Sequence, residues 1–361
     1  MKSSSCSYCS KGKSLWSRLY NCDVCKQSIC GSCLIPVNPR DLILVQGICL
    51  RCHKVLTDSS SDDVYLPTEL EIQETNLKYL SIISKDPFQD FDLISSIGSG
   101  NFSRVYHVRQ RDNHKDYALK QLCFGKGDRM QAYNEFIQSV GCQSRNILKN
   151  YALYQNEQEY YILQELMHST ISDFIKYNEF VPEEIILYIL REILQGLCYM
   201  HKNFVIHRDI KSENIFLSFE GEIKIGDFGS VAQLTQERDL RNTLVGTPFY
   251  LAPEIVKGES YGTSVDVWSL GILSYELVFK QPLFFECKNF AELFPKIKKF
   301  SDDSLTDSEY PRVNEFFRLC LVKNPEERVS CSELLKQTLF EFDSNACKEF
   351  IMDYIRRNTK F

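Results

Sequence analysis

The sequence predicts an α+β protein in two parts, a small cysteine-rich module followed by one large domain. Of the fifteen cysteines, eight fall in residues 6–52 as four CxxC pairs, and the others are scattered singly. From about residue 89 to residue 340 the chain alternates short strand-like and helical patterns without a break. The chain of 361 residues is long for one domain, and its 43% of hydrophobic residues suffice for a sizeable core.

The composition favours a cytosolic or nuclear protein, and we expect a cytoplasmic location. No window contains the eighteen or more uncharged apolar residues that span a bilayer, so no transmembrane segment is expected. The opening MKSSSCSYCS lacks the apolar core of a secretory signal. The formal net charge of −6 argues against nucleic acid as a partner.

Residues 1–56 are predicted to fold around two structural zinc ions. In a chain without a secretory signal, clustered CxxC pairs indicate zinc ligands rather than disulfides. Four pairs of thiolates make two closed tetrahedral Cys₄ sites, and bound metal would stabilise a segment too small for a thick core. The predicted zinc ligands are Cys6, Cys9, Cys22, Cys25, Cys30, Cys33, Cys49 and Cys52.

Residues 57–88 are predicted to be an acidic linker that includes a helix. The stretch begins TDSSSDDVY, which is typical of a solvated linker. Thr68 and Glu71 then form a T-x-x-E capping box, and Leu70, Leu77 and Leu80 recur at helical spacing. At the other end of the chain, residues 341–361 are expected to form a tail with a short helix and a basic end.

The large domain, residues 89–340, contains a series of motifs in a fixed order. IGSGNFSRVYHV begins at Ile97 as a glycine turn between two strand-like runs, where glycines let backbone amides approach phosphate oxygens. YALKQL then supplies Lys120 within a strand, and Glu135 follows in a predicted helix. HRDIKSEN at 207–214 is followed by GDFG, GTPFYLAPE and DVWSLG. Coincidence accounts for any one of these motifs but not for all of them at these intervals.

These motifs resemble the catalytic domain of eukaryotic protein kinases, over about 250 residues. The resemblance implies a bilobal fold, with a β-rich N-lobe, a helical C-lobe and ATP between them. Lys211 and Thr247 resemble the serine/threonine branch, so the implied acceptors are Ser and Thr hydroxyls of protein substrates. RNTLVGT resembles the sterile-type and NIMA-related branches. Because the motif set is complete, an active enzyme is expected, and the alternative is a catalytically weak kinase-fold scaffold.

The resemblance also implies roles for single residues. Asp209 would accept the proton of the substrate hydroxyl, and Asn214 and Asp227 would hold Mg²⁺. Lys120, held by Glu135, would pair with the α- and β-phosphates. The implied catalytic residues are Asp209, Lys211, Asn214, Lys120 and Glu135. The implied nucleotide-binding residues are Ile97, Gly98, Gly100, Ser103, Val105, Ala118, Lys120, Glu165, Met167, Asn214 and Asp227.

Residues 227–254 would be the activation segment, and Thr243 is the predicted phosphorylation site within it. A phosphate there carries nearly two charges and would pair with Arg208, which would order the segment. The same resemblance also implies two contacts that stabilise the fold. Asp266 should brace the catalytic loop, and Arg328 should pair with Glu254.

The cysteine spacing resembles the FYVE finger, which implies two interleaved sites. One would use Cys6, Cys9, Cys30 and Cys33, and the other Cys22, Cys25, Cys49 and Cys52. Two successive zinc ribbons are the alternative pairing. FYVE fingers bind phosphatidylinositol 3-phosphate through a basic stretch, of which this chain keeps Arg18 but has Asp23 in place of an arginine. Trp16 beside basic residues fits either a membrane anchor or packing on the zinc scaffold. The module therefore targets endosomal phosphoinositide, docks a protein, or is purely structural.

Overall fold

The computed structural model describes residues 19–21, 28–30, 34–35, 48–49, 82–99, 103–123, 129–142, 144–234, 240–241, 243 and 245–358. The chain separates into two compact units. One contains residues 1–78 and 235–239, and the other contains residues 79–234 and 240–361.

The first unit has four short described strands in two antiparallel pairs. β1 (Leu19–Asn21) pairs with β2 (Ser28–Cys30), and β3 (Leu34–Ile35) pairs with β4 (Ile48–Cys49). Side chains of the eight predicted zinc ligands lie outside the described part of the chain, and so does the predicted linker helix. Both zinc sites therefore stay predictions.

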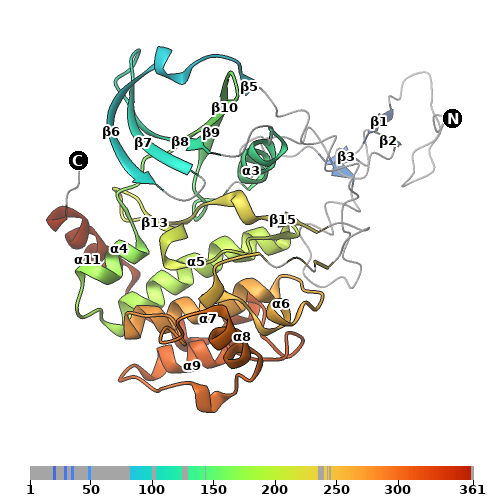
Figure 1. Cartoon of the computed structure of the whole chain (residues 1–361), viewed down its shortest axis with the longest axis vertical. Coiled ribbons are helices and arrows are strands. Elements are labelled where there is room, and N and C mark those ends of the chain that lie inside the picture. The colour runs from blue at the N-terminus through green and yellow to red at the C-terminus, as the bar shows by residue number, and fades with distance from the viewer. Residues whose placement is uncertain are drawn as a thin grey trace. The chain divides into compact units, whose positions relative to one another are not determined.

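The second unit begins with a six-stranded sheet, drawn at the top of Figure 1. The strand order is β5-β9-β10-β8-β7-β6, and every neighbouring pair is antiparallel except β5 with β9. The strands are β5 (Ile82–Ile83), β6 (Phe91–Ser99), β7 (Ser103–Gln110), β8 (Asp116–Leu122), β9 (Asn150–Asn156) and β10 (Glu159–Gln164). Aromatic and β-branched residues fill one face, where Phe91 meets Tyr154 edge to face at 6.1 Å between ring centroids.

Helix α3 (Arg129–Gly141) packs on the sheet through one apolar stripe. Ala132 and Phe136, one helical turn apart, are buried against Leu153 and other strand residues. Glu135, adjacent to this stripe, is therefore carried to the sheet and is buried there. The helix thus positions a carboxylate opposite β8.

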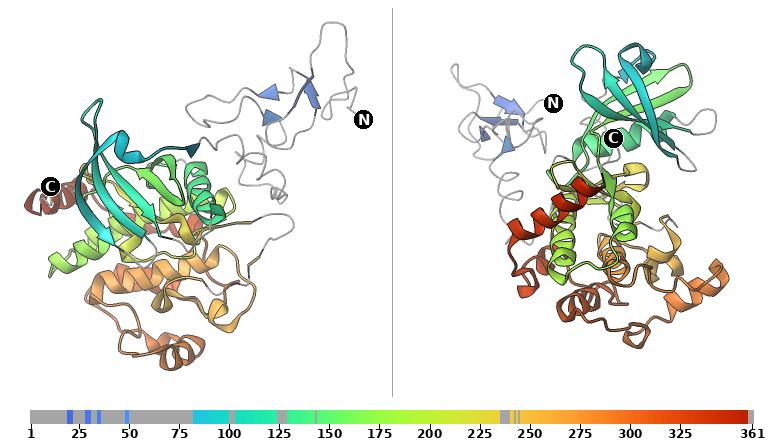
Figure 2. Two further views of the ribbon diagram at one scale, coloured as in Figure 1. Left: turned by 45° about the horizontal axis from the view of Figure 1, so that its top comes forward. Right: turned by 90° about the vertical axis from the view of Figure 1, so that its left-hand side faces the viewer.

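The rest of the second unit is mainly helical, as Figure 1 and both views of Figure 2 show. The α-helices are α4 (Ile171–Tyr177), α5 (Glu183–Lys202), α6 (Pro253–Lys257), α7 (Ser264–Phe279), α8 (Phe290–Lys298), α9 (Pro311–Cys320), α10 (Cys331–Leu334) and α11 (Ser344–Arg357). The short strands are β11 (Ser169–Thr170), β12 (Val205–Ile206), β13 (Ile215–Leu217), β14 (Ile223–Ile225) and β15 (Ala232–Gln233). The 3₁₀ turns are η1 (Pro87–Gln89), η2 (Ser212–Asn214), η3 (Phe228–Ser230), η4 (Pro248–Tyr250), η5 (Asp302–Ser304) and η6 (Thr338–Phe340).

Helices α5 and α7 form the core of the helical part, since both are buried along most of their length. Gly271 of the DVWSLG motif lies where α7 meets α9. A Cβ at this position would lie 2.7 Å from Cys320 Cβ and 2.8 Å from Leu321 Cγ. Glycine therefore lets the two helices approach more closely than alanine would.

The expected tail helix is present as α11, with Arg356 and Arg357 in its last turn. It packs beside α4 and α5, as the right view of Figure 2 shows, and Tyr354 meets Phe174 of α4 at 4.9 Å between ring centroids. The predicted order of a β-rich part followed by a helical part is confirmed. Within the described residues, no helix is long and apolar enough to cross a membrane.

Candidate active site

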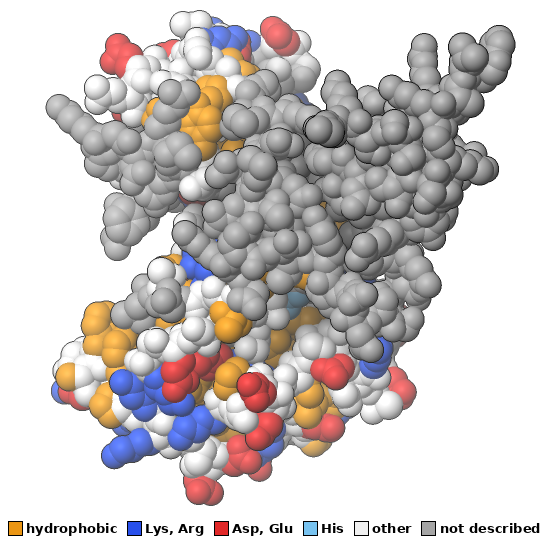
Figure 3. Space-filling model, turned by 90° about the vertical axis from the view of Figure 1, so that its right-hand side faces the viewer, with side chains coloured by type: hydrophobic (Ala, Val, Ile, Leu, Met, Phe, Trp, Pro, Cys, Tyr) orange, Lys and Arg blue, Asp and Glu red, His pale blue; other side chains and the backbone are white. Residues whose placement is uncertain are grey.

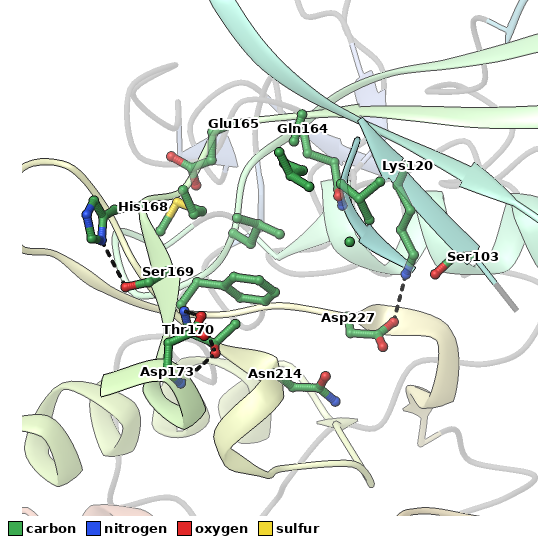
Figure 4. Close-up of a pocket in the computed structure, with 17 residues that line it drawn as sticks. Ser103, Lys120, Gln164, Glu165, His168, Ser169, Thr170, Asp173, Asn214 and Asp227 are labelled. Atoms are coloured by element: carbon green, nitrogen blue, oxygen red, sulfur yellow. Dashed lines mark hydrogen bonds and ion pairs between the residues drawn. The ribbon is translucent and has the colours of Figure 1, made fainter. Parts of the chain in front are cut away.

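A cavity of about 270 Å³ lies between the sheet and the helical part (Figure 4). The predicted nucleotide-binding residues that line it are Ile97, Gly98, Ser103, Val105, Ala118, Lys120, Glu165, Met167, Asn214 and Asp227. Gly100, also predicted to bind nucleotide, lies outside the described residues. The structure thus brings together residues that are up to 130 positions apart in the chain, from Ile97 to Asp227.

Strand geometry explains how the sheet presents side chains to this cavity. Ala118 and Lys120 of β8 are two residues apart, so both project from the same face. β6 and β7 pair antiparallel across the glycine turn, with Gly98 opposite Val105. The two strands therefore form one wall of the cavity, and Lys120 projects into it.

Lys120 forms ion pairs with two carboxylates from distant parts of the chain. Its Nζ lies 2.6 Å from Glu135 Oε1 and 2.9 Å from Asp227 Oδ1. Figure 4 shows Lys120 and Asp227 facing each other at one end of the cavity. α3 supplies Glu135, and the turn that begins η3 supplies Asp227, whose φ of 62° is in the left-handed region.

Lys120 and Asp227 stay ionised in this cluster, whereas burial raises the pKa of Glu135. Burial disfavours the charged form of Lys120, but Glu135 and Asp227 outweigh burial and raise the pKa of Lys120 above its ordinary value. For Asp227, burial acts to raise the pKa, yet the Lys120 cation outweighs it and lowers the pKa to about 2. Asp227 is therefore a carboxylate at any pH near neutrality.

Asn214 and Asp227 present oxygen atoms that suit Mg²⁺. Asn214 Nδ2 donates to the backbone oxygen of Asp209 at 2.8 Å and to its Oδ2 at 3.0 Å, which turns Asn214 Oδ1 away from that loop. Asp227 engages Lys120 and the Gly229 amide through Oδ1, which leaves Oδ2 for a metal. Carboxylate and amide oxygens are ligands that Mg²⁺ prefers. Within the described residues, no cluster of three or more His, Cys, Asp or Glu side chains could hold a metal by itself.

Asp266 of α7 holds the loop that carries Asp209, as expected. The Asp266 carboxylate accepts from the backbone amides of His207 at 2.9 Å and Arg208 at 2.8 Å. It also lies 2.9 Å from His201 Nε2. Because Arg208 has a φ of 68°, the loop bends sharply there, and the two amide contacts hold that bend.

The Asp209 carboxylate is surrounded by donors. It accepts from the Thr247 amide at 2.9 Å, from Thr247 Oγ1 at 2.7 Å and from Asn214 Nδ2 at 3.0 Å. Lys211 Nζ lies 3.0 Å from Asp209 Oδ2 and donates to Thr247 Oγ1 at 2.8 Å. Lys211 and Thr247 therefore join the loop of Asp209 to the segment that precedes α6.

The connection between the two lobes presents a polar residue to the cavity. Gln164 is buried, and its side-chain amide donates to Asn150 Oδ1 at 2.7 Å. The carboxylate of the neighbouring Glu165 accepts from the Lys149 amide at 2.6 Å and forms an ion pair with Lys224 at 2.9 Å. Any contact of Glu165 with a nucleotide would therefore use its backbone.

Sequence reasoning missed several lining residues, namely Leu148, His168, Ser169, Thr170, Asp173 and Phe216. Thr170 and Asp173 form a reciprocal capping box at the start of α4, with contacts of 3.1 Å. The T-x-x-D spacing after the strand was a signal that could have located both. Leu148 carries no local signal, because its place in the cavity depends on how its loop packs against β14.

Arg208 links Thr243 to the turn after Asp227. Arg208 Nη1 donates to Thr243 Oγ1 at 3.1 Å, while Nε donates to the Ser230 carbonyl at 2.5 Å. Thr243 is exposed, and its carbonyl accepts from the Tyr261 hydroxyl at 2.9 Å. The guanidinium therefore connects the predicted phosphorylation site to the segment that carries a predicted metal ligand.

Comparison with known proteins agrees with this geometry. Residues 91–340 match the family model described as the protein kinase domain. The chain is 34% identical over 261 residues to serine/threonine-protein kinase 4 homolog B of Dictyostelium discoideum, which covers 71% of this chain and 23% of that protein. It is 33% identical over 270 residues to serine/threonine-protein kinase cst-1 of Caenorhabditis briggsae, covering 72% of this chain and 53% of that protein. A third relative, serine/threonine-protein kinase CLA4 of Candida albicans, is 33% identical over 302 residues, which cover 78% of this chain and 30% of that protein. The chain thus spans between about a quarter and a half of these relatives' lengths.

Proposed function

The chain belongs to the protein kinase family, and we propose that it transfers the γ-phosphoryl group of Mg-ATP to serine and threonine hydroxyls of other proteins. One observation carries this proposal. The Lys120–Asp227 pair faces the cavity, while Asp209, Lys211 and Thr247 form a second cluster. Asn214 lines the same cavity and donates to the Asp209 carboxylate. Phosphoryl transfer requires little more than positioned cations and a carboxylate near the incoming hydroxyl.

Each residue has a part in this chemistry. Lys120 would hold the α- and β-phosphates, and Glu135 keeps its ammonium group in position. Asn214 and Asp227 would hold Mg²⁺, which neutralises charge on the β- and γ-phosphates when bound. Asp209 would orient the acceptor hydroxyl and take its proton, and Lys211 beside it would offset charge that develops on the transferred group.

Peptide phosphorylation tests the acceptor class. We expect labelling of peptides that contain one serine or threonine, and none above background when tyrosine replaces that residue. The bridge between Lys211 and Thr247 supports this expectation, as do the names of the relatives. Equal labelling of the tyrosine peptide would contradict the acceptor class. If no peptide were labelled, the chain would instead be a kinase-fold scaffold.

We also propose that phosphorylation of Thr243 activates the kinase. The Arg208 guanidinium already contacts the Thr243 hydroxyl, and a phosphate there would convert this contact to a charge-assisted one. Since Arg208 also holds the Ser230 carbonyl, the added charge would order the turn after Asp227.

Thr243→Ala should lower kcat about tenfold, because it removes the phosphate and with it one hydrogen bond to a charged group. Phosphatase treatment of the wild-type chain should lower kcat to the same level. The control is Thr338→Ala, another exposed threonine, which should have no effect. Full activity of the Thr243→Ala chain, unchanged by phosphatase, would exclude this switch.

We further propose that residues 1–56 bind two zinc ions and serve for targeting or docking in the cytoplasm. The support is the spacing of the eight cysteines. Two zinc ions per chain are expected by elemental analysis, and fewer would contradict the proposal. Flotation with vesicles that contain or lack phosphatidylinositol 3-phosphate separates endosomal lipid targeting from protein docking.

A further inference from the structure

A surface of aromatic and basic residues surrounds α8, and we call it the α8 surface. Its aromatic members are Phe249, Phe284, Phe285, Phe290 and Phe294, and its basic members are Lys288, Lys296, Lys298 and Lys299. Figure 3 shows lysine and arginine side chains gathered beside apolar ones on the helical part of the molecule.

Two of the five aromatic side chains of the α8 surface are exposed, and the other three are half-buried. Phe290 is 60% exposed and Phe285 is 49% exposed. The ring of Phe290 stacks on Phe294, one helical turn further along, with 5.4 Å between centroids and 13° between planes. Single exposed apolar residues are ordinary, but adjoining aromatic rings at a surface mark an interaction site.

The α8 surface is continuous with the proposed acceptor site. Phe249 meets Phe285 at 5.7 Å between ring centroids, and it packs on the small core under α8. Phe249 also follows Thr247 by two residues, and Thr247 contacts the Asp209 carboxylate through both its amide and its hydroxyl. A protein whose hydroxyl lies at Asp209 can therefore extend over these rings.

Three of the four lysines of the α8 surface have no carboxylate partner among the described residues. Of its four lysines, Lys296 pairs with Glu286. The Glu292 carboxylate accepts hydrogen bonds from the Lys288 backbone amide and the Asn289 side chain at the start of α8. Within the described part of the chain, no carboxylate lies within ion-pair distance of the ammonium groups of Lys288, Lys298 and Lys299.

We propose that the α8 surface docks the protein substrate through a segment of large apolar side chains flanked by Asp or Glu. This inference rests on the proposed kinase function. The unpaired lysines favour an acidic partner, and the aromatic rings favour an apolar one. A second copy of this chain fits less well, because its own lysines would face these lysines.

Three peptides test the proposal on the full chain. The first contains a serine acceptor alone. The second adds a flexible Gly/Ser linker of about ten residues and a tail of Phe, Leu and Glu, and the third replaces each Glu of the tail by Lys. Two series of peptides are made, with the tail at the N-terminal or the C-terminal end, so that both directions of binding across the α8 surface are tested. The steady-state kcat and KM are measured for each peptide.

For the wild-type chain, the acidic tail should lower KM about tenfold and leave kcat unchanged. This result is expected because the tail binds equally well in the ground state and the transition state. The Lys298→Glu/Lys299→Glu double variant should lose this gain and favour the peptide with the basic tail. Phe290→Ser should lose the gain for the acidic tail. Lys336→Glu and Phe180→Ser, which alter exposed residues outside the α8 surface, should behave as the wild type.

The possible failures are distinguishable. If the wild type does not phosphorylate the untailed peptide, the proposed function fails. If that peptide is phosphorylated but the tails change no KM, the docking proposal is overturned. The docking proposal is also overturned if Phe290→Ser dissociates a wild-type dimer in light scattering, or abolishes binding to anionic vesicles while the tails have no effect. Equal melting temperatures of the variants show that all are folded.

Discussion

Replacement of Asp209 by asparagine is expected to lower kcat for a serine peptide by about 10²–10⁴-fold, the usual contribution of a general base. The KM for ATP should change little, because Asp209 does not line the nucleotide cavity. The measurement is steady-state phosphorylation of one peptide by both proteins at saturating Mg-ATP.

The local geometry makes this change severe although the two side chains have the same size. Donors surround the Asp209 carboxylate on both oxygens, with Thr247 at Oδ1 and both Asn214 and Lys211 at Oδ2. An amide at this position points an N–H group at one of these donors, so that contact becomes repulsive. The substituted side chain therefore cannot accept the hydroxyl proton, and it also weakens the link to Thr247.

Asp303→Asn is the matched control, because Asp303 is exposed in η5. Its kcat should equal that of the wild type. Retention of more than about a tenth of wild-type kcat by Asp209→Asn would show that Asp209 is not the proton acceptor.

Replacement of Glu254 by glutamine is expected to reduce the free energy of unfolding by about 3–5 kcal/mol, because it leaves a buried guanidinium without its counter-charge. Arg328 Nη1 lies 2.7 Å from Glu254 Oε1, and Nη2 lies 3.2 Å from Oε2. The two side chains are 0% and 1% exposed. This expected pair is confirmed, and the guanidinium also lies 5.2 Å from the ring centroid of Trp268. Urea unfolding monitored by Trp fluorescence provides the measurement.

Two further variants test whether the loss of stability comes from the unpaired, buried charge of Arg328. The double variant Glu254→Leu/Arg328→Met removes both charges together and should be more stable than Glu254→Gln. Asp307→Asn, which breaks an exposed pair with Arg318, should change the free energy of unfolding by less than about 1 kcal/mol. If Glu254→Gln were as mild as Asp307→Asn, the buried pair would not stabilise the fold.

Local patterns were sufficient to predict the elements that carry the site. The alternation around Lys120 predicted a strand, and the glycine turn after Ile97 predicted a strand pair, which is how β6, β7 and β8 run. These patterns depend on neighbouring residues, so they can be read from the chain alone. The capping box at Thr170 is an equally local pattern.

The α8 surface could not be predicted in this way. Phe249 lies in η4 and Phe285 lies in the loop before α8, 36 residues apart, so only the folded chain brings their rings together. Apolar residues at helical spacing ordinarily indicate a buried face. Whether Phe290 is covered or exposed depends on what packs over it, and that is a property of the folded chain.

The sequence by itself determined the order and identity of the groups that the chemistry needs, because cations, carboxylates and glycines at fixed intervals restrict what a chain can bind. It also determined the four cysteine pairs, whose zinc sites stay a prediction. Only the tertiary structure decided that Lys120, Glu135 and Asp227 share one ion-pair cluster, and that Thr247 reaches Asp209 across 38 residues. Such contacts arise when burial of the strands, α5 and α7 closes long loops, and no local pattern encodes which distant side chains then meet.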